Sequence, residues 1–252
     1  MQCVKQFAPA EIVLELELSC HDSTALPYIQ RTGRSQLTKL LPILQELDLQ
    51  PSIAIIESPD EPLYFRDTTD FNRWFAHYYF ELNRVLERTA GHPLQRLIIG
   101  NEFKELERRP AQEWHHLTDS LRAFCDAKLV YSTTPERVRN VNIWPLVDEI
   151  GIAYLPVADG SLKRAHRTWH EDISDLVRTY EKPIYISHAN VIGDHKLLQF
   201  KNKTRFWDEA VRVNGINLNT VYSTTVLNDT SQYFGWPSSP EALDYLKSYT
   251  GK

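Results

Sequence analysis

The sequence predicts an α/β fold of the (β/α)8 TIM-barrel type, in which about seven strands are recognisable. Short apolar or β-branched runs alternate with stretches of helical periodicity along the chain, and this alternation is typical of parallel strands joined by helices. A length of 252 residues with 42% hydrophobic residues suits one barrel, because such barrels commonly reach about 250 residues as one domain. We therefore expect a single domain that covers residues 1–252.

The first half of the chain contributes four predicted strands and three predicted helices. The first strand alternates leucine with glutamate, and the other three are mainly apolar runs, as expected for strands buried on both faces. These strands are expected at 12–18, 52–56, 96–100 and 128–132. Helical patterns lie between or after them at 36–48, 70–89 and 112–126, with Asp70 near a start and Gly91 near a stop.

The second half continues the same alternation. Strands are expected at 150–155, 183–187 and 216–222, and helices at 169–180 and 203–213. No low-complexity segment or Gly/Ser linker interrupts the series, which supports one continuous domain.

Residues 97–102, Leu-Ile-Ile-Gly-Asn-Glu, place Asn101 and Glu102 at the C-terminal end of the strand at 96–100. In a barrel of parallel strands this end holds the active site, so a carboxyl group there is a candidate acid or base. The alternative is that Glu102 starts the next helix, where its charge favours the helix dipole.

Three later segments accompany this pair. They are Trp144-Pro145-Leu146-Val147-Asp148-Glu149-Ile150-Gly151-Ile152-Ala153-Tyr154-Leu155-Pro156, Lys182-Pro183-Ile184-Tyr185-Ile186-Ser187, and Tyr233-Phe234-Gly235-Trp236-Pro237 followed by Pro240. They resemble the sixth strand, the seventh strand and the closing segment of clan A glycoside hydrolases, above all of the mannanase-like branch. The resemblance implies a TIM barrel that acts on carbohydrate.

Aligning Asn101-Glu102 with the clan's fourth strand makes 52–56 the third strand and 12–18 the second. Either the barrel lacks its first strand and another chain or segment fills the gap, or the sequence begins after that strand. An uncovered edge invites pairing, so a protein partner or self-association is expected there. Glu15 and Glu17 could guard this edge, or they could be ordinary solvated side chains.

The resemblance implies that Glu102 is the catalytic acid/base and that Asn101 contacts a sugar hydroxyl. Retaining glycosidases need a second carboxyl group about 5 Å away, which the clan places on the seventh strand after Ser or Thr. Here Ser187 is followed by His188. His188 could bind a hydroxyl, act as a base or be an ordinary hydrogen-bonded histidine.

Three other carboxyl groups follow predicted strands and could pair with Glu102. They are Asp22, Glu57 and Asp159. A separation of about 6.5–9.5 Å would allow an inverting mechanism through water. The alternative for each is a loop residue or a helix cap.

Aromatic residues that follow or end predicted strands could form a platform for a sugar ring. Their members are Trp144, Tyr154, Tyr222 and Trp236. Some of these rings could instead plug the barrel.

Composition and motifs exclude several classes of function. The net charge of −5, with basic residues scattered along the sequence, argues against a nucleic-acid partner. We expect no cofactor, because neither a dinucleotide fingerprint nor a phosphate loop is present. No metal site is expected either. The pairs His166/His170 and His115/His116 lack the order or spacing of ligands.

Three cysteines without metal-ligand spacing, Cys3, Cys20 and Cys125, favour a reducing compartment. No apolar run approaches the roughly 18 residues of a membrane span. If Met1 is the native start, the protein is expected in the cytoplasm.

Two functions stay open: a glycoside hydrolase, or a catalytically inactive barrel that serves as a carbohydrate-binding or protein-interaction scaffold.

Overall fold

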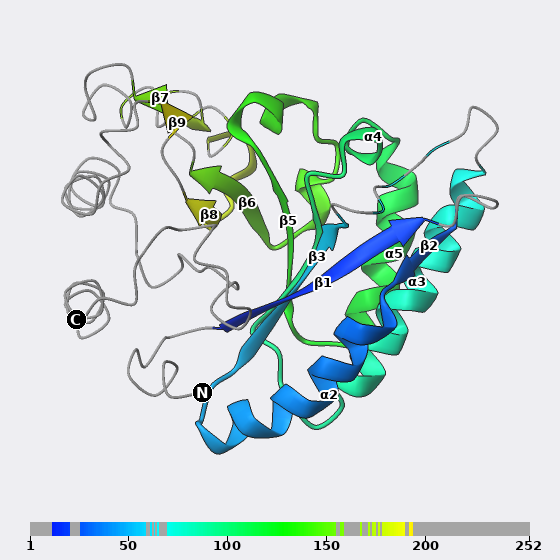
Figure 1. Ribbon diagram of the computed structural model, residues 1–252. Coiled ribbons are helices and arrows are strands. Elements are labelled where there is room, and N and C mark those ends of the chain that lie inside the picture. Colours follow the sequence, from blue (N-terminus) through cyan, green and yellow to red (C-terminus); the bar gives the residue numbers. More distant parts are fainter. Residues whose placement is uncertain are drawn as a thin grey trace, which may run out of the picture.

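A mainly parallel sheet forms the centre of the computed structural model (Figure 1). The structure describes residues 12–20, 26–58, 61, 63, 65, 70–154, 157–158, 167, 171, 173, 174, 176, 178–189 and 192–193. The sheet runs in the order β2-β1-β3-β4-β5-β6-β8. Its strands are β1 (Ile12–Cys20), β2 (Pro27–Ile29), β3 (Pro51–Glu57), β4 (Arg96–Asn101), β5 (Lys128–Thr133), β6 (Glu149–Tyr154) and β8 (Ile184–Ala189).

Six of the seven predicted strands are confirmed, and they pair in parallel in the order in which they occur in the chain. The seventh, at 216–222, lies outside the described residues. A separate pair, β7 (Val157–Ala158) and β9 (Ile192–Gly193), follows β6 and β8. The prediction of one domain over 1–252 stays a prediction.

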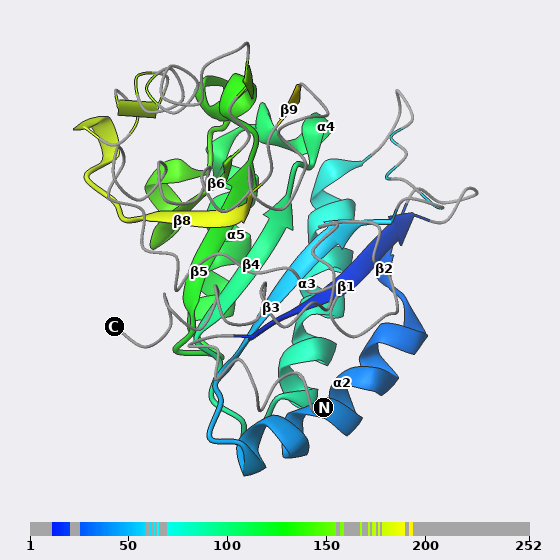
Figure 2. The same cartoon turned by 60° about the vertical axis from the view of Figure 1, so that its left-hand side comes forward.

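Three long helices lie along one face of the sheet, as Figures 1 and 2 both show: α2 (Arg31–Glu46), α3 (Phe71–Arg88) and α5 (Ala111–Arg122). Asp70 caps α3, its Oδ1 accepting from the backbone N–H of Arg73 at 3.1 Å. The helix predicted at 36–48 begins at Arg31 instead, without a side-chain cap at Gln30 that would mark its start. No described helix is long and apolar enough to span a bilayer.

The later predicted helices are only partly described. Residues 171, 173, 174, 176 and 178–180 are helical, in agreement with the helix expected at 169–180. The one expected at 203–213 lies outside the described residues.

Two apolar layers pack on opposite faces of the sheet. The larger one joins the helices to alternate strand residues, including Leu16, Ile55 and Ile99. The smaller one consists of Val13, Ala54, Ile98, Val130 and Tyr185. This alternation follows the two-residue period of a strand, and it places the smaller cluster on the face away from α2, α3 and α5.

β2 covers part of the edge that was expected to be open at β1, and a partner along the rest of that edge stays a prediction. This three-residue strand pairs antiparallel with Leu18, Ser19 and Cys20, at the C-terminal end of β1. Nor is Glu17 simply solvated, because its carboxylate accepts a hydrogen bond from Ser58 Oγ at 3.3 Å.

An ion-pair cluster ties three neighbouring strands together near their N-terminal ends. Glu149 of β6 accepts from Arg96 of β4 and from Lys128 of β5, each at 2.5 Å. The Arg96 guanidinium also lies 5.0 Å from the centroid of the Tyr185 ring. The buried charges of Arg96 and Glu149 are therefore paired, as burial requires, and the more exposed Lys128 adds a second cation.

Candidate active site

Glu102 lies directly after β4, at the C-terminal end of the parallel strands. Its backbone N–H donates to Ser132 O at 2.9 Å, which fixes the turn against β5. Its φ of 59° is in the left-handed region that side chains other than Gly, Asn and Asp rarely adopt. Such strain persists where surrounding structure enforces it, and it is found most often at functional sites.

The sequence around Glu102 makes this turn possible. Gly100 has Tyr131 and Phe103 packed so closely that a Cβ atom would lie 2.7–2.9 Å from their rings. The Phe103 N–H then donates to the Tyr131 hydroxyl at 3.1 Å. A residue without a side chain at position 100 therefore lets two rings hold the segment that carries Glu102.

Burial raises the pKa of the Glu102 carboxyl, and the nearby carboxylate of Glu107 raises it further. Lys104 and Arg137 act in the opposite direction but do not reverse the shift. A carboxyl group that keeps its proton nearer to neutral pH is suited to general-acid chemistry.

Glu107 is a fully buried carboxylate that the sequence analysis did not identify. Its Oε1 accepts from Thr133 Oγ1 at 2.7 Å and from the Tyr131 hydroxyl at 3.3 Å. Its Oε2 accepts from Arg137 Nε at 2.8 Å and lies 2.6 Å from Nη2. Glu107 thus fixes Arg137 beside the C-terminal ends of β4 and β5.

Two buried polar atoms accompany Glu102. Asn101 Oδ1 and Ser132 Oγ make no hydrogen bond within the described part of the chain. The two residues are register partners across β4 and β5. Their hydrogen-bonding capacity is therefore unused among the described residues, and the contact of Asn101 with a sugar hydroxyl stays a prediction.

Tyr154 and His188 lie on adjacent strands. Tyr154 of β6 is in register with Ala189 of β8, the neighbour of His188. Because β4, β5, β6 and β8 run parallel, Glu102, Tyr154 and His188 all belong to the C-terminal ends of strands. The structure describes the backbone of Tyr154 and His188 but not their side chains.

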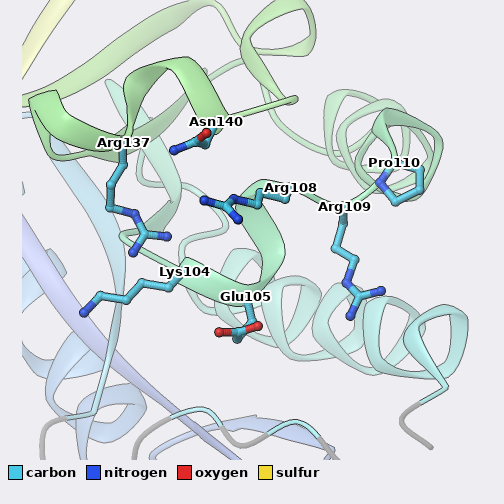
Figure 3. Close-up of a pocket in the computed structure, with 7 residues that line it drawn as sticks. All are labelled: Lys104, Glu105, Arg108, Arg109, Pro110, Arg137 and Asn140. Carbon is cyan, nitrogen blue, oxygen red and sulfur yellow. The ribbon is translucent and has the colours of Figure 1, made fainter. Parts of the chain in front are cut away.

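A cavity of about 570 Å³ opens next to this site, between the short helix α4 (Lys104–Glu107) and the 3₁₀ helix η1 (Pro135–Asn140) (Figure 3). Its lining residues are Lys104, Glu105, Arg108, Arg109, Pro110, Arg137 and Asn140. The sequence alone does not indicate this cluster, because its cations come from two segments, residues 104–109 and 137, that only the fold brings together. The adjacent Arg108-Arg109 pair was the one local signal.

Comparison with protein families identifies the chain. The model of Glycoside Hydrolase Family 113 matches residues 29–196, which is two thirds of the sequence. The chain belongs to this family. The resemblance to the mannanase-like branch of clan A is thereby confirmed.

Solved structures give the GH113 chain the same fold. It is similar to a structure described as a complex of GH113 β-1,4-mannanase, with a TM-score of 0.74, 16% identity, and coverage of 99% of this chain and 90% of the other. For GH113 β-mannanase AaManA from Alicyclobacillus acidocaldarius in complex with ManMIm, the TM-score is 0.70 and the identity 13%, with coverage of 99% of this chain and 90% of the other. For a fungal β-1,4-galactanase, the TM-score is 0.62 and the identity 12%, with coverage of 87% of this chain and 76% of the other. The search of curated proteins found no match.

These matches confirm the TIM-barrel fold class. That the first strand is missing, and that His188 replaces the usual nucleophile, stay predictions.

Within this GH113 fold, Trp144 is neither a platform nor a plug of the barrel, because it belongs to the larger apolar layer between the sheet and the helices. It is 1% exposed, its indole N–H donates to Val138 O at 2.8 Å, and its ring packs against Tyr131. It therefore supports the β5 side of the site and offers no platform. Tyr222 and Trp236 lie outside the described residues.

The other candidate groups have structural partners or lie beyond the described chain. Glu57 accepts from the backbone N–H of Leu63 at 2.9 Å, the loop role that was its alternative. His115 lies 2.8 Å from Asp119 on the exposed face of α5. No group of three or more potential metal ligands occurs among the described residues. Asp22, Asp159, His166 and His170 lie outside them.

Proposed function

We propose that this GH113 chain is a glycoside hydrolase-like protein that acts on or binds a β-linked polysaccharide or oligosaccharide, with Glu102 as general acid/base. The observation that carries the proposal is the Glu102 carboxyl at the end of β4, half-buried and with a raised pKa. Family membership supports the reaction class. The mannanases and galactanase of similar fold support a β-linked substrate.

In the proposed reaction, the Glu102 carboxyl donates its proton to the glycosidic oxygen as the bond to the anomeric carbon breaks. Asn101 holds a hydroxyl of the same sugar. The anomeric carbon must then be captured, either by a side chain or by water. His188 is the residue of this chain at the clan's nucleophile position, where it would bind a hydroxyl or activate water.

Tyr154, Tyr222 and Trp236 are proposed to supply the rings on which the sugar lies. Titration with β-linked manno-, gluco- and galacto-oligosaccharides, followed by tryptophan fluorescence and calorimetry, tests this part. Absence of any response at millimolar concentration would contradict it.

The histidine at position 188 favours a second candidate, a catalytically inactive barrel. An imidazole does not readily replace a carboxylate that must form and release a glycosyl ester. Such a protein would keep the sugar groove for binding carbohydrate, or use the barrel to bind a protein partner.

Hydrolysis of an aryl glycoside with a poor leaving group distinguishes the two candidates. If the wild type is active, Glu102→Gln should lower its rate by roughly 10²–10⁴, the usual contribution of a general acid. Glu87→Gln is the matched control, because this glutamate of α3 is exposed and does not line the site or the cavity. An active wild type that tolerates Glu102→Gln would show that Glu102 is not the acid.

His188→Glu tests whether the chain is a degenerate retaining enzyme. The substitution restores a carboxylate at the end of β8 and should produce measurable turnover of an activated aryl glycoside with retained anomeric configuration. If the wild type is folded but inactive and the His188→Glu variant is inactive as well, the result would favour the non-catalytic scaffold.

A further inference from the structure

The cavity beside Glu102 gathers positive charge on a chain whose net charge is −5. Four cationic side chains line it, Lys104, Arg108, Arg109 and Arg137, against the single carboxylate of Glu105. Figure 3 shows that Arg108, which follows α4, and Arg137 of η1 extend toward each other, whereas the side chains of Lys104 and Arg109 point outward on opposite sides. The cluster is thus a local reversal of the overall charge.

Two of the four cations have a partner within the protein. Arg137 is held by the buried carboxylate of Glu107, and the guanidinium of Arg109 stacks 3.3 Å from the ring centroid of Phe71. Lys104 and Arg108 are exposed, and neither forms an ion pair with a described residue. Like charges held together repel one another, and an anion placed between them relieves that repulsion.

Hydrogen bonds hold the wall of the cavity in place. Asn142 Nδ2 donates to the carbonyl oxygens of Arg108 and Arg109, both at 3.1 Å. The Asn142 N–H donates to Glu107 O at 2.9 Å, and Trp114 Nε1 donates to Leu106 O at 3.2 Å. The backbone that carries Arg108 is therefore fixed against the loop after η1, which reduces the ordering needed when a ligand binds.

The cationic groups have the chemistry of a site for carboxylate or phosphate. Glu107 occupies Nε and Nη2 of Arg137, which leaves part of its five-donor fork for a ligand. The Arg108 guanidinium is a second fork, and such forks bind carboxylate and phosphate oxygens in pairs. A volume of about 570 Å³ lies within the usual range of small-ligand sites.

We propose that this cavity binds the anionic substituent of an acidic carbohydrate, a carboxylate or a phosphate ester carried on a sugar, while the sugar chain passes Glu102. Lys104 follows Glu102 by two residues, and both Lys104 and Arg137 act electrostatically on its carboxyl group. Cavity and acid are therefore neighbours. The assignment rests on the proposed function, to which it adds a substrate class.

Binding can be measured without hydrolysis in the Glu102→Gln variant of the whole 252-residue chain. The probes are methyl β-glucuronoside, its neutral counterpart methyl β-glucoside, and inorganic phosphate, each titrated by calorimetry at low salt. The glucuronoside should bind at least tenfold more tightly than the glucoside, and the difference should shrink as salt screens the charges. Competition by phosphate identifies the shared anion site.

The variants are Arg108→Gln and Lys104→Gln, with Lys39→Gln as the matched control on the exposed face of α2. Because a hydrogen bond to a charged group contributes about 1.5–3 kcal/mol, each cavity variant should weaken anion binding by about tenfold or more. Circular dichroism shows whether each variant is folded. Both side chains are exposed, so folding should be unaffected.

The outcomes distinguish a carboxylate from a phosphate ester as the ligand, or show that the cavity binds no anion. Binding of phosphate without binding of the glucuronoside would assign a phosphate ester as the source. No binding of either anion, or an equal loss with Lys39→Gln, would overturn the site. Anion binding without any glycosidase activity in the wild type would support the anion site and contradict the proposed hydrolysis. Hydrolysis of neutral β-mannan with no preference for anionic sugars would support the hydrolysis and contradict the anion site.

Discussion

Glu107→Gln should separate the contribution of a buried charge to stability from its effect on the acid. The substitution keeps the size of the side chain but removes the charge that pairs with Arg137 at 2.6 Å. It also places an amide N–H₂, which cannot accept, against either Arg137 or the hydroxyl groups of Thr133 and Tyr131. One charged group is then left without its partner.

The magnitude follows from burial. The Glu107 side chain is fully buried and that of Arg137 is 24% exposed. Breaking a buried pair by removing one partner costs 3–5 kcal/mol, and the partial exposure of Arg137 places the expected loss near the lower limit, at about 3 kcal/mol. For a domain of this size that loss lowers Tm by about 6–12 °C.

The same change should lower the pKa of Glu102. The Glu107 carboxylate raises that pKa, and Arg137, no longer neutralised, lowers it. Thermal unfolding measures the first effect, and NMR titration of 13C-labelled glutamate carboxyls measures the second. Glu105→Gln is the control for both. A Tm within 2 °C of the wild type, or an unchanged Glu102 titration, would refute this account.

Two further predictions concern stability. Because folding raises the pKa of Glu102, stability is lost as pH rises from the ordinary carboxyl value to the raised one; Glu102→Gln should therefore increase Tm at pH 7, and the gain should vanish below about pH 4. Gly151→Ala should cost about 1–3 kcal/mol in urea unfolding, because its Cβ would lie 2.7–2.9 Å from Ser132 and the Tyr131 carbonyl. Gly91→Ala, with nothing within 4 Å but a φ of +84°, should cost about 1 kcal/mol from backbone strain alone. A smaller loss at Gly151 than at Gly91 would contradict the packing argument.

The strands could be predicted because buried parallel strands are long apolar runs that few other structures explain. β3, β4 and β5 are of this kind. Helix α4 and strand β2 have only four and three residues, too short for a periodic pattern. They form because neighbours support them: Glu81 accepts from the Ile29 N–H of β2 at 2.9 Å, and Asn142 binds the chain after α4.

The site was predictable to a similar extent. Asn101-Glu102 follows an apolar run, so its place at a strand end could be inferred. The pairing of Glu107 with Arg137 joins residues 30 positions apart, and no local pattern indicates it. The role of Trp144 could not be predicted either, because its position beside a strand gives no information on which way the ring points.

The order of the strands has a consequence for synthesis of the chain. In the large sheet each parallel strand pairs with the parallel strand made just before it, at separations from 19 residues (Tyr131 with Ile150) to 45 (Ile56 with Asn101). The sheet can therefore grow one strand at a time as the polypeptide leaves the ribosome. The strand that presents Glu102 finds its partners early, while the strand that presents His188 joins after some 80 further residues. Until then the last strand of the half-built sheet has an unpaired edge, and such an edge can pair with other chains.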